Sequence, residues 1–233
     1  MDLQQFLESA FYILKGTGWT AGLILGAMSL GFAIGLPLAS LRVYGPRPLG
    51  RLLGVYVWFF RGVPILVLLF LVYFGVYPIL ERLLHSLFHL RHAFSPFSAS
   101  LAALGLASGA YQSQIFKGAI LSVSPGQFKA ARALGFSSFT AVTRIVLPQA
   151  LRLSIPAWSN EYSILLKDSA VAYTLGTLEI MARTKFMASQ TYRHVTFYLL
   201  AGALYFVLTW LGVSLLKRVR RATMIPGLGN QAL

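Results

Sequence analysis

A long stretch without any charged side chain, Trp19–Leu41, sets narrow limits on how this chain can fold. About 20 consecutive apolar residues are enough for a helix to cross the hydrocarbon core of a bilayer. In lipid the backbone must satisfy its own hydrogen bonds, which a helix does. Glycines recur along the stretch at nearly every fourth position, and small residues at that spacing let helices approach closely. The sequence therefore predicts a transmembrane helix packed inside a bundle.

Further apolar runs extend this prediction to the whole chain. Of the residues, 57% are hydrophobic and 11% are charged, and the mean hydropathy is +0.69. The charged share is about half that of an ordinary soluble domain. We therefore expect an all-α integral membrane protein, with residues 1–233 forming one domain of about five spans and residues 2–15 a short amphipathic lead-in helix. The expected spans are residues 19–41, 52–77, 99–121, 151–178 and 196–216.

The basic residues of the chain are distributed unevenly between the predicted connections. Twelve Lys and Arg, and no Asp or Glu, follow spans one, three and five. Six Lys and Arg and four acids occupy the N-terminus and the other two connections. By the positive-inside rule the N-terminus lies outside and the C-terminus in the cytoplasm, together with residues 122–150. The net charge of +14 is thus an orientation signal, and we expect no nucleic-acid partner.

The second predicted span is interrupted where Arg61 is followed by Gly62 and, two residues later, by Pro64. An arginine inside a bilayer needs a partner, the interface or a water-filled cavity. A discontinuous helix beside a polar site near the middle of the membrane is typical of transporters. This break is therefore a candidate part of a transport pathway.

The fourth predicted span carries a polar band. On a continuous helix Glu161, Leu165 and Asp168 share one stripe, whereas Asn160 and Lys167 share another. Polar groups within a span mark a functional site or pair with one another inside the bundle. The band is the second candidate part of the pathway.

Together these two features give the candidate substrate pathway. Asp168 is suited to binding an ammonium group and Arg61 a carboxylate, which is the minimum that a zwitterion requires. The alternative is that these charges pair with each other and only hold the bundle together. The candidate pathway residues are Arg61, Pro64, Glu161, Asp168 and Ser169.

The chain shows no energy source and no catalytic centre of its own. No phosphate-binding loop of the Walker type is present, so either a separate subunit drives transport or a gradient does. No nucleophile–base arrangement indicates an enzyme. Three histidines, His85, His89 and His92, are spaced along one possible helix face, but no carboxylate or cysteine completes a metal site there. We expect no bound metal or other cofactor.

Residues 126–148 form a basic interruption between apolar runs, which predicts a helix-turn-helix on the membrane surface. The segment resembles the EAA loop of binding-protein-dependent ABC transporter permeases, in which Glu-Ala-Ala is followed by Gly and then by Ile-x-Leu-Pro. The spacing of that pattern is intact here. The matching residues are Ala130, Ala131, Gly135, Ile145, Leu147 and Pro148.

Three other stretches resemble the polar amino-acid branch of the same family: Phe59–Gly75, Gly109–Gln127 and Leu165–Ile180. The resemblance extends over about residues 16–221. It implies a type I importer bundle with a second permease subunit, the same or homologous. It also implies two ATPase subunits that bind ATP and Mg, an extracytoplasmic amino-acid-binding protein, and the inner membrane of a prokaryote.

The resemblance assigns the loop to coupling with the ATPase. Gly135 is expected to permit the sharp turn and Pro148 to end the second arm. Two residues depart from the family pattern, because Lys129 replaces the Glu of the motif and Gln114 replaces a Glu of the third span. We expect the ATPase to present an acid to Lys129 or to leave it solvated.

The function predicted from the sequence is the transmembrane subunit of an ATP-driven amino-acid importer. A gradient-driven carrier or channel is the alternative, and it would not need a cytoplasmic coupling loop. The substrate stays open, because two observations point in different directions. Residues 159–162 resemble the glutamate/aspartate type of the family, whereas a buried Glu161 favours a cation.

Overall fold

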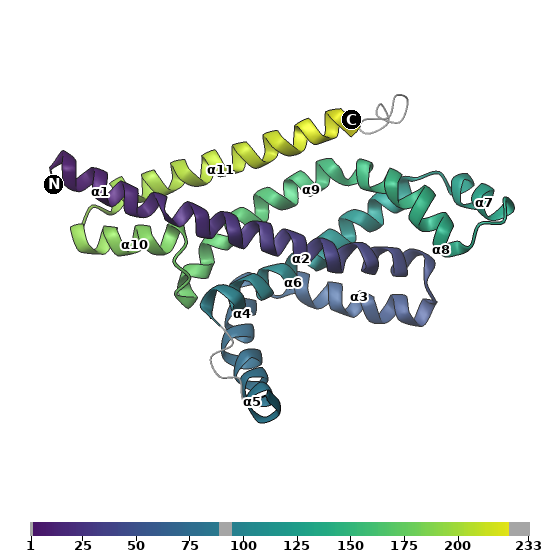
Figure 1. The fold of residues 1–233 in the computed structure, drawn as a ribbon, viewed down its shortest axis with the longest axis horizontal. Coiled ribbons are helices and arrows are strands. Elements are labelled where there is room, and N and C mark those ends of the chain that lie inside the picture. The colour runs from purple at the N-terminus through teal and green to yellow at the C-terminus, as the bar shows by residue number, and fades with distance from the viewer. Residues whose placement is uncertain (1, 89–94, 224–233) are drawn as a thin grey trace.

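The computed structural model describes residues 2–88 and 95–223. Every regular element in these two ranges is a helix (Figure 1). The three helices at the centre are α2 (Gly16–Tyr44), α6 (Pro96–Ser122) and α9 (Leu147–Ser169), with α3 (Arg47–Gly62) and α11 (His194–Thr223) beside them. The predicted all-α bundle is confirmed. At about 1.5 Å per residue, α2 is long enough to cross a bilayer.

The packing of α2 on α6 depends on glycine. A Cβ atom built on Gly31 would lie 2.5 Å from Nε2 of Gln112, and one built on Gly35 would lie 2.9 Å from the backbone nitrogen of Ser113. Any larger side chain at these positions would push the two helices apart. The prediction that the glycines of the first span serve close helix packing is confirmed at these two positions.

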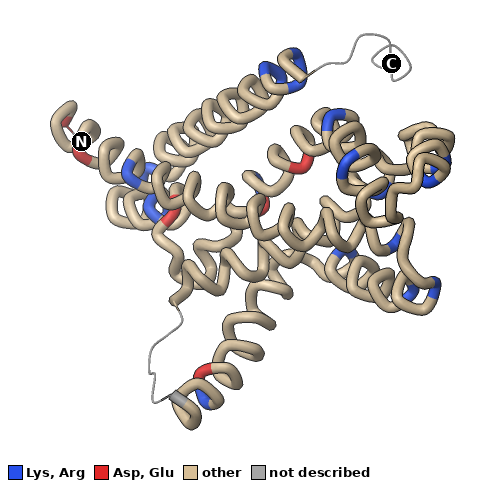
Figure 2. Tube along the Cα trace, turned by 45° about the vertical axis from the view of Figure 1, so that its right-hand side comes forward, with Lys and Arg blue, Asp and Glu red and all other residues tan. Residues whose placement is uncertain are grey.

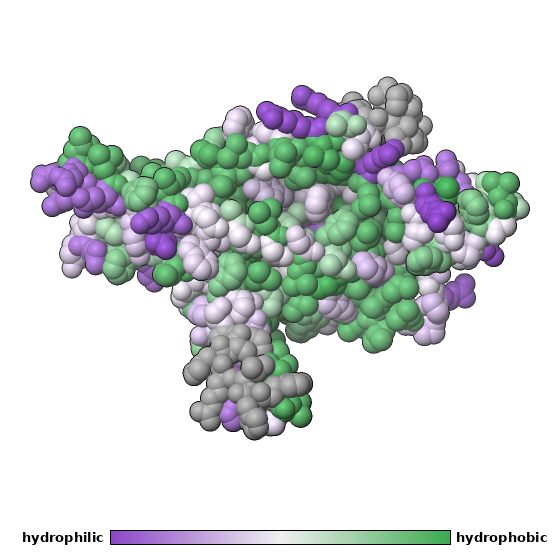
Figure 3. Space-filling model, in the orientation of Figure 1, coloured by the Kyte–Doolittle hydropathy of each residue, from purple (hydrophilic) through white to green (hydrophobic). Residues whose placement is uncertain are grey.

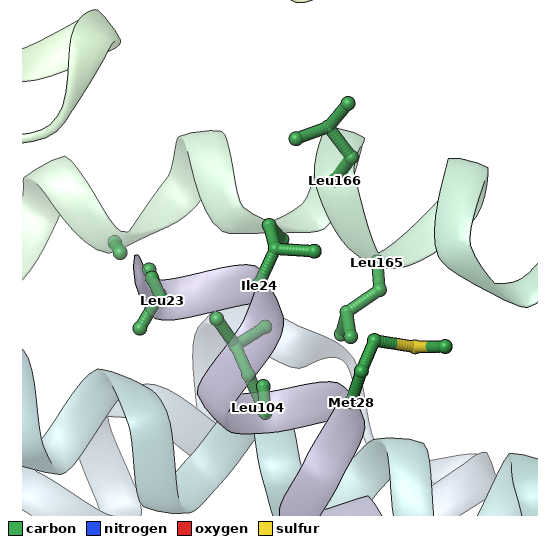
Figure 4. Close-up of a cluster of buried hydrophobic side chains, with 8 residues drawn as sticks. Leu23, Ile24, Met28, Leu104, Leu165 and Leu166 are labelled. Atoms are coloured by element: carbon green, nitrogen blue, oxygen red, sulfur yellow. The ribbon is translucent and has the colours of Figure 1, made fainter. Parts of the chain in front are cut away.

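The core lies where α2, α6 and α9 meet. Figure 4 shows side chains from these helices converging on one apolar cluster, which Leu23, Ile24, Leu104 and Leu166 help to form, each no more than 1% exposed. A second apolar cluster around Phe116 and Val146 joins the same helices near the end of the bundle that carries the 126–148 segment. The central helices are thereby held together along their length.

The surface agrees with a membrane environment. Figure 3 shows a face that is mainly hydrophobic along its middle, with hydrophilic side chains gathered toward the two ends. Within the described residues, three stretches are long and apolar enough to cross a membrane: Leu3–Tyr44, Ile65–Leu87 and His194–Thr223. The central helices α6 and α9 are not among these stretches, and many of their residues are buried against other helices.

The second predicted span differs from the observed elements. The chain breaks at Val63 and Pro64, so α3 and the next helical stretch are separate, as the interruption at Arg61–Pro64 indicated. The later stretch then continues far beyond residue 77, where a connection was predicted. It runs through α4 (Ile65–Phe70), a π-helical turn η1 (Leu71–Val76) and α5 (Tyr77–Phe88), and α5 projects from the bundle in Figure 1.

Helices also occupy the end of the bundle where the chain begins. The lead-in helix α1 (Leu3–Leu14) was predicted, whereas α10 (Ile180–Thr191) replaces an expected connection. Helix α9 continues into a 3-10 turn, η3 (Ala170–Leu175). The carboxylate of Glu179 caps α10 by accepting hydrogen bonds from the backbone of Met181 and Ala182, and it also accepts one from the hydroxyl of Tyr205 on α11.

Candidate functional site

A cavity of about 270 Å³ lies where the break between α3 and α4 faces α6 and α9. Pro64 is the N-cap residue of α4, a position that needs no backbone N–H for the helix, and the break at Val63–Pro64 leaves irregular backbone at the cavity wall. Irregular backbone at membrane depth is tolerated where it lines a cavity. The volume is close to the lower limit for pockets that hold small ligands.

Four of the five residues predicted for the substrate pathway line this one cavity. Arg61 and Pro64 come from the break, whereas Glu161 and Asp168 come from one stripe of α9. The predicted stripe is confirmed, because Leu165 lines the cavity as well and Lys167 is exposed elsewhere. These four residues are brought together from segments about 100 positions apart in the chain.

Ser169, the fifth predicted residue, does not line the cavity. Its side chain is fully buried, and its hydroxyl donates to the backbone carbonyl of Leu166 one turn earlier, at 2.7 Å. Such a bond within one helix satisfies the hydroxyl locally and leaves no group for a ligand.

The charged groups of the cavity are not paired with one another. The guanidinium of Arg61 lies over the ring of Tyr111, 5.1 Å from its centroid. Within the described residues neither Glu161 nor Asp168 forms an ion pair with Arg61. One guanidinium and two carboxylates therefore face the same small space, each with capacity for a ligand.

A chain of buried hydrogen bonds leads to Glu161 from behind the cavity wall. The indole of Trp158 donates to Oε1 of Gln112 at 2.8 Å, and Nε2 of Gln112 donates to the hydroxyl of Ser108 at 3.0 Å. That hydroxyl donates to Oε1 of Glu161 at 2.8 Å. Neither Ser108 nor Trp158 was among the residues predicted from the sequence, because their partners lie on other helices.

The 126–148 segment is a helix-turn-helix, as predicted. It consists of α7 (Pro125–Ala133), α8 (Ser138–Ala141) and a π-helical turn η2 (Val142–Val146). Gly135 has a φ of 85°, and the backbone N–H groups of Gly135 and Phe136 donate to the carbonyls of Arg132 and Ala131. These two bonds form a Schellman motif, which places glycine four positions after the residue whose carbonyl is capped. The Ala-x-x-x-Gly spacing of the motif is thus the spacing of a helix end.

The motif residues divide into two groups in the structure. Ala131 is buried, Ile145 is partly buried, and Leu147 is partly buried against the apolar cluster around Phe116 and Val146. Lys129 and Ala130 are exposed on the outward side of α7. An exposed apolar side chain, Phe139, stands close by on α8 and is 78% exposed. The segment thus presents a small surface of charged and apolar side chains, and the residues beneath that surface pack into the bundle.

The prediction for Pro148 was wrong in one respect. The proline does not end the second arm, because α8, η2 and α9 follow one another without a break and Pro148 is the second residue of α9. The π-helical turn directly before it has i→i+5 bonding, shown by the bond from the Leu147 nitrogen to the Val142 carbonyl. A wider turn of this kind accommodates the proline ring inside a helix.

The remaining candidates lie away from both sites. His85 is on α5, whereas His89 and His92 lie outside the described residues. Glu179 lies in the connection between the fourth and fifth spans. Burial raises the pKa of its carboxyl above the ordinary value, and its hydrogen bonds from Tyr205 and the α10 backbone act in the opposite direction.

Comparison with known proteins decides the family. Residues 31–224 match the family model for the inner membrane component of binding-protein-dependent transport systems. The chain belongs to this family. It is therefore a membrane-embedded permease that works with a binding protein. The alternative function, a gradient-driven carrier or channel, is excluded.

Curated relatives align over nearly the whole permease. The nopaline transport system permease protein NocM of Agrobacterium fabrum is 36% identical over 211 residues, covering 90% of this chain and 87% of that protein. The probable amino-acid permease protein YxeN of Bacillus subtilis is 35% identical and covers 95% and 96%. The histidine/lysine/arginine/ornithine permease HisM of Salmonella typhimurium is 33% identical and covers 90% and 89%.

Solved structures share the fold. A crystal structure of an amino acid ABC transporter with histidines has a chain that is 29% identical, with a TM-score of 0.79, covering 95% of this permease and 99% of that chain. An inward-facing form of the MetNI methionine ABC transporter has a TM-score of 0.74 at 21% identity, covering 97% and 100%. The type I importer bundle predicted from the sequence is confirmed as the fold.

Proposed function

We propose that this permease is the transmembrane subunit of an ATP-driven importer that carries amino acids across the inner membrane of a prokaryote. The observation that carries the proposal is the cavity between α3, α4, α6 and α9, where one guanidinium and two carboxylates face the same small volume without pairing. Relatives named as permeases for amino acids and their derivatives support this substrate class.

In this proposal the cavity holds the two charged ends of an amino acid. Arg61 binds the α-carboxylate, and Asp168 binds the α-ammonium group. Pro64 fixes the break that brings Arg61 to the cavity wall, and Glu161 receives whatever positive group remains. A ligand that satisfies these groups removes the cost of keeping them unpaired in a low-dielectric site.

The 126–148 segment is the contact with the ATPase. Its outward surface, with Lys129 and Ala130 on α7 and Phe139 on α8, docks on that subunit, and an acid of the ATPase faces Lys129. The base of the segment packs against the inner ends of α2 and α9, so a movement of the surface is transmitted to the bundle as a rigid displacement. ATP and Mg are held by the ATPase.

The complete assembly contains two ATPase subunits, a second permease subunit that is the same or homologous, and an extracytoplasmic amino-acid-binding protein. Figure 2 supports the orientation, because Lys and Arg gather at the end of the molecule that carries α7 and the end of α11. That end faces the cytoplasm, and α1 and α10 lie toward the outside.

The test is ATP hydrolysis and uptake by the reconstituted complex with its binding protein, measured across the amino acids. We expect at least one amino acid to stimulate both activities, and Arg61→Ala to reduce uptake by about 10-fold or more. Lys167→Gln, which changes an exposed charge on α9 that does not line the cavity, is the matched control. Uptake that proceeds on an ion gradient without ATP, or no response to any amino acid, would refute the proposal.

A further inference from the structure

The hydrogen bonds behind the cavity run in one direction only. An indole nitrogen can donate a hydrogen bond but cannot accept one, so Trp158 is the donor and the amide oxygen of Gln112 is the acceptor. The amide nitrogen of Gln112 then donates to the Met28 carbonyl at 3.1 Å and to the hydroxyl of Ser108. Because that hydroxyl already accepts from Gln112, its one proton is free to point to Glu161. From Trp158 through Gln112 and Ser108, each residue therefore donates one hydrogen bond toward the carboxyl group of Glu161, and the second amide hydrogen of Gln112 goes to Met28.

The chain is built into the tightest part of the bundle. The side chain of Gln112 is fully buried, and that of Ser108 is 1% exposed. Both lie against Gly31, where an added Cβ would meet Nε2 of Gln112 and the hydroxyl of Ser108. The amide and the hydroxyl thus have no room to turn to other partners, and the direction of the chain is fixed by packing.

The effect on Glu161 is specific. Its Oε1 is held as the acceptor of the Ser108 hydrogen bond, which fixes the orientation of the carboxyl group, and linked bonds of this kind strengthen one another. Its Oε2 forms no hydrogen bond within the described residues and belongs to a side chain that lines the cavity. Glu161 is therefore held in a fixed orientation with one carboxyl oxygen left for a positively charged group in the ligand space.

The charges of the cavity then do not balance for a neutral amino acid. Arg61 takes the α-carboxylate and Asp168 the α-ammonium group, which leaves Glu161 without a partner. An unpaired buried charge is costly, and a second positive group on the ligand removes that cost. We propose that Trp158, Gln112 and Ser108 are positioning residues that hold Glu161 as the selector for an amino acid with a positively charged side chain. This inference rests on the proposed function.

The test compares arginine with citrulline, which has nearly the same shape but a neutral end. Binding of each radiolabelled amino acid is measured by equilibrium dialysis on the purified complex of permease and ATPase in nanodiscs. We expect the wild-type complex to bind arginine about 10-fold or more tightly than citrulline. Trp158→Phe, Gln112→Met and Ser108→Ala should each lower arginine binding about 5-fold or more and change citrulline binding less than about 2-fold.

Controls separate positioning from stability. Ser154→Ala removes a buried hydroxyl on α9 that donates only to the Leu151 carbonyl and takes no part in the chain from Trp158 to Glu161. It should leave the affinities for arginine and citrulline unchanged. Trp158→Phe keeps an aromatic ring in place, so its melting temperature reports whether the bundle is intact. A loss of arginine and citrulline binding in equal proportion would overturn the positioning role.

Two further outcomes distinguish this inference from the function on which it rests. If some amino acid stimulates ATP hydrolysis by the complete complex but arginine and citrulline bind the wild type equally, the charge selection is wrong and the importer function stands. If no amino acid stimulates hydrolysis, the proposed function fails and this inference fails with it.

Discussion

Among single residues, Gly35 shows most directly how the sequence sets the packing of α2 on α6. An added methyl group would lie 2.9 Å from the backbone nitrogen of Ser113, which cannot move away alone. We predict that Gly35→Ala destabilises the permease by about 1–3 kcal/mol, the usual cost of overpacking. The measurement is thermal unfolding in detergent.

Gly22 provides the matched control on the same helix. A Cβ there would meet only the ring edge of Phe97, at 3.9 Å, which is an ordinary contact. Gly22→Ala should therefore be neutral or slightly stabilising, because alanine favours a helix by up to about 1 kcal/mol over glycine. Equal melting temperatures for the two variants would contradict the proposed role of Gly35 in packing.

Glu179 links three parts of the permease through one fully buried side chain. It accepts hydrogen bonds from the backbone of Met181 and Ala182 and from the hydroxyl of Tyr205. Glu179→Ala leaves all three donors without this acceptor, and we predict a loss of about 1–3 kcal/mol or more in stability. Tyr205→Phe removes one donor and keeps the cap of α10, so it should cost less. The reverse order in denaturant unfolding would count against this account.

The residues of the cavity were predictable from the sequence only in part. Glu161 and Asp168 could be found because a charged stripe on an apolar helix is visible in one segment, and Arg61 because it precedes a proline in a predicted span. Ser108 and Trp158 could not be found in this way. Their significance depends on which helices are neighbours, and the bonds from Trp158 to Gln112 and from Ser108 to Glu161 join positions 46 and 53 residues apart.

Of the secondary-structure elements, α7 and the turn after it give the clearest link between motif and shape. Gly135 has a φ of 85°, which costs a residue with a Cβ about 1–2 kcal/mol. We predict that Gly135→Ala opens this turn, seen as faster limited proteolysis between residues 134 and 137, while the melting temperature of the bundle changes little. Uptake per ATP hydrolysed should fall at the same time.

Gly126 is the control for this turn, because it lies in α7 itself and its φ is not positive. Gly126→Ala should leave the proteolysis pattern and the coupling as they are in the wild type. If Gly135→Ala were cleaved no faster than Gly126→Ala, the Schellman motif would not be what holds the segment in shape.

Elements whose surfaces are partly covered by other helices were the hardest to predict. Helix α10 has a polar sequence, yet Ile180, Thr184 and Ala188 are buried against α1, α2 and α11. A hydropathy pattern detects exposure to lipid and does not detect this kind of burial. Helix α5 was placed in a connection for a different reason: its charged and histidine side chains indicate the end of a span, although the stretch Ile65–Leu87 is apolar enough to cross a membrane.

Across the whole molecule, basic and acidic residues are distributed unevenly between the two ends of the bundle. Lys and Arg without nearby acids occupy the end with α7 and the C-terminal part of α11, whereas the acids Asp2, Glu8 and Glu179 belong to elements at the other end (Figure 2). This separation was predictable, because it depends only on which connection each charge occupies. The central position of α6 was not, because its modest hydropathy reflects neighbours that the sequence does not name.

The absence of cysteine from the chain makes the orientation directly testable. Two single-cysteine variants place a thiol at opposite ends: Gln190→Cys on the exposed side of α10 and Ala133→Cys on the exposed side of α7. We predict that a membrane-impermeant maleimide labels Gln190→Cys in intact spheroplasts and labels Ala133→Cys only after the membrane is opened. The reason is that the proposed orientation places the basic end, which carries α7, in the cytoplasm. The opposite pattern would place the coupling segment outside, where no ATPase could reach it, and both the orientation and the coupling role of residues 126–148 would have to be abandoned.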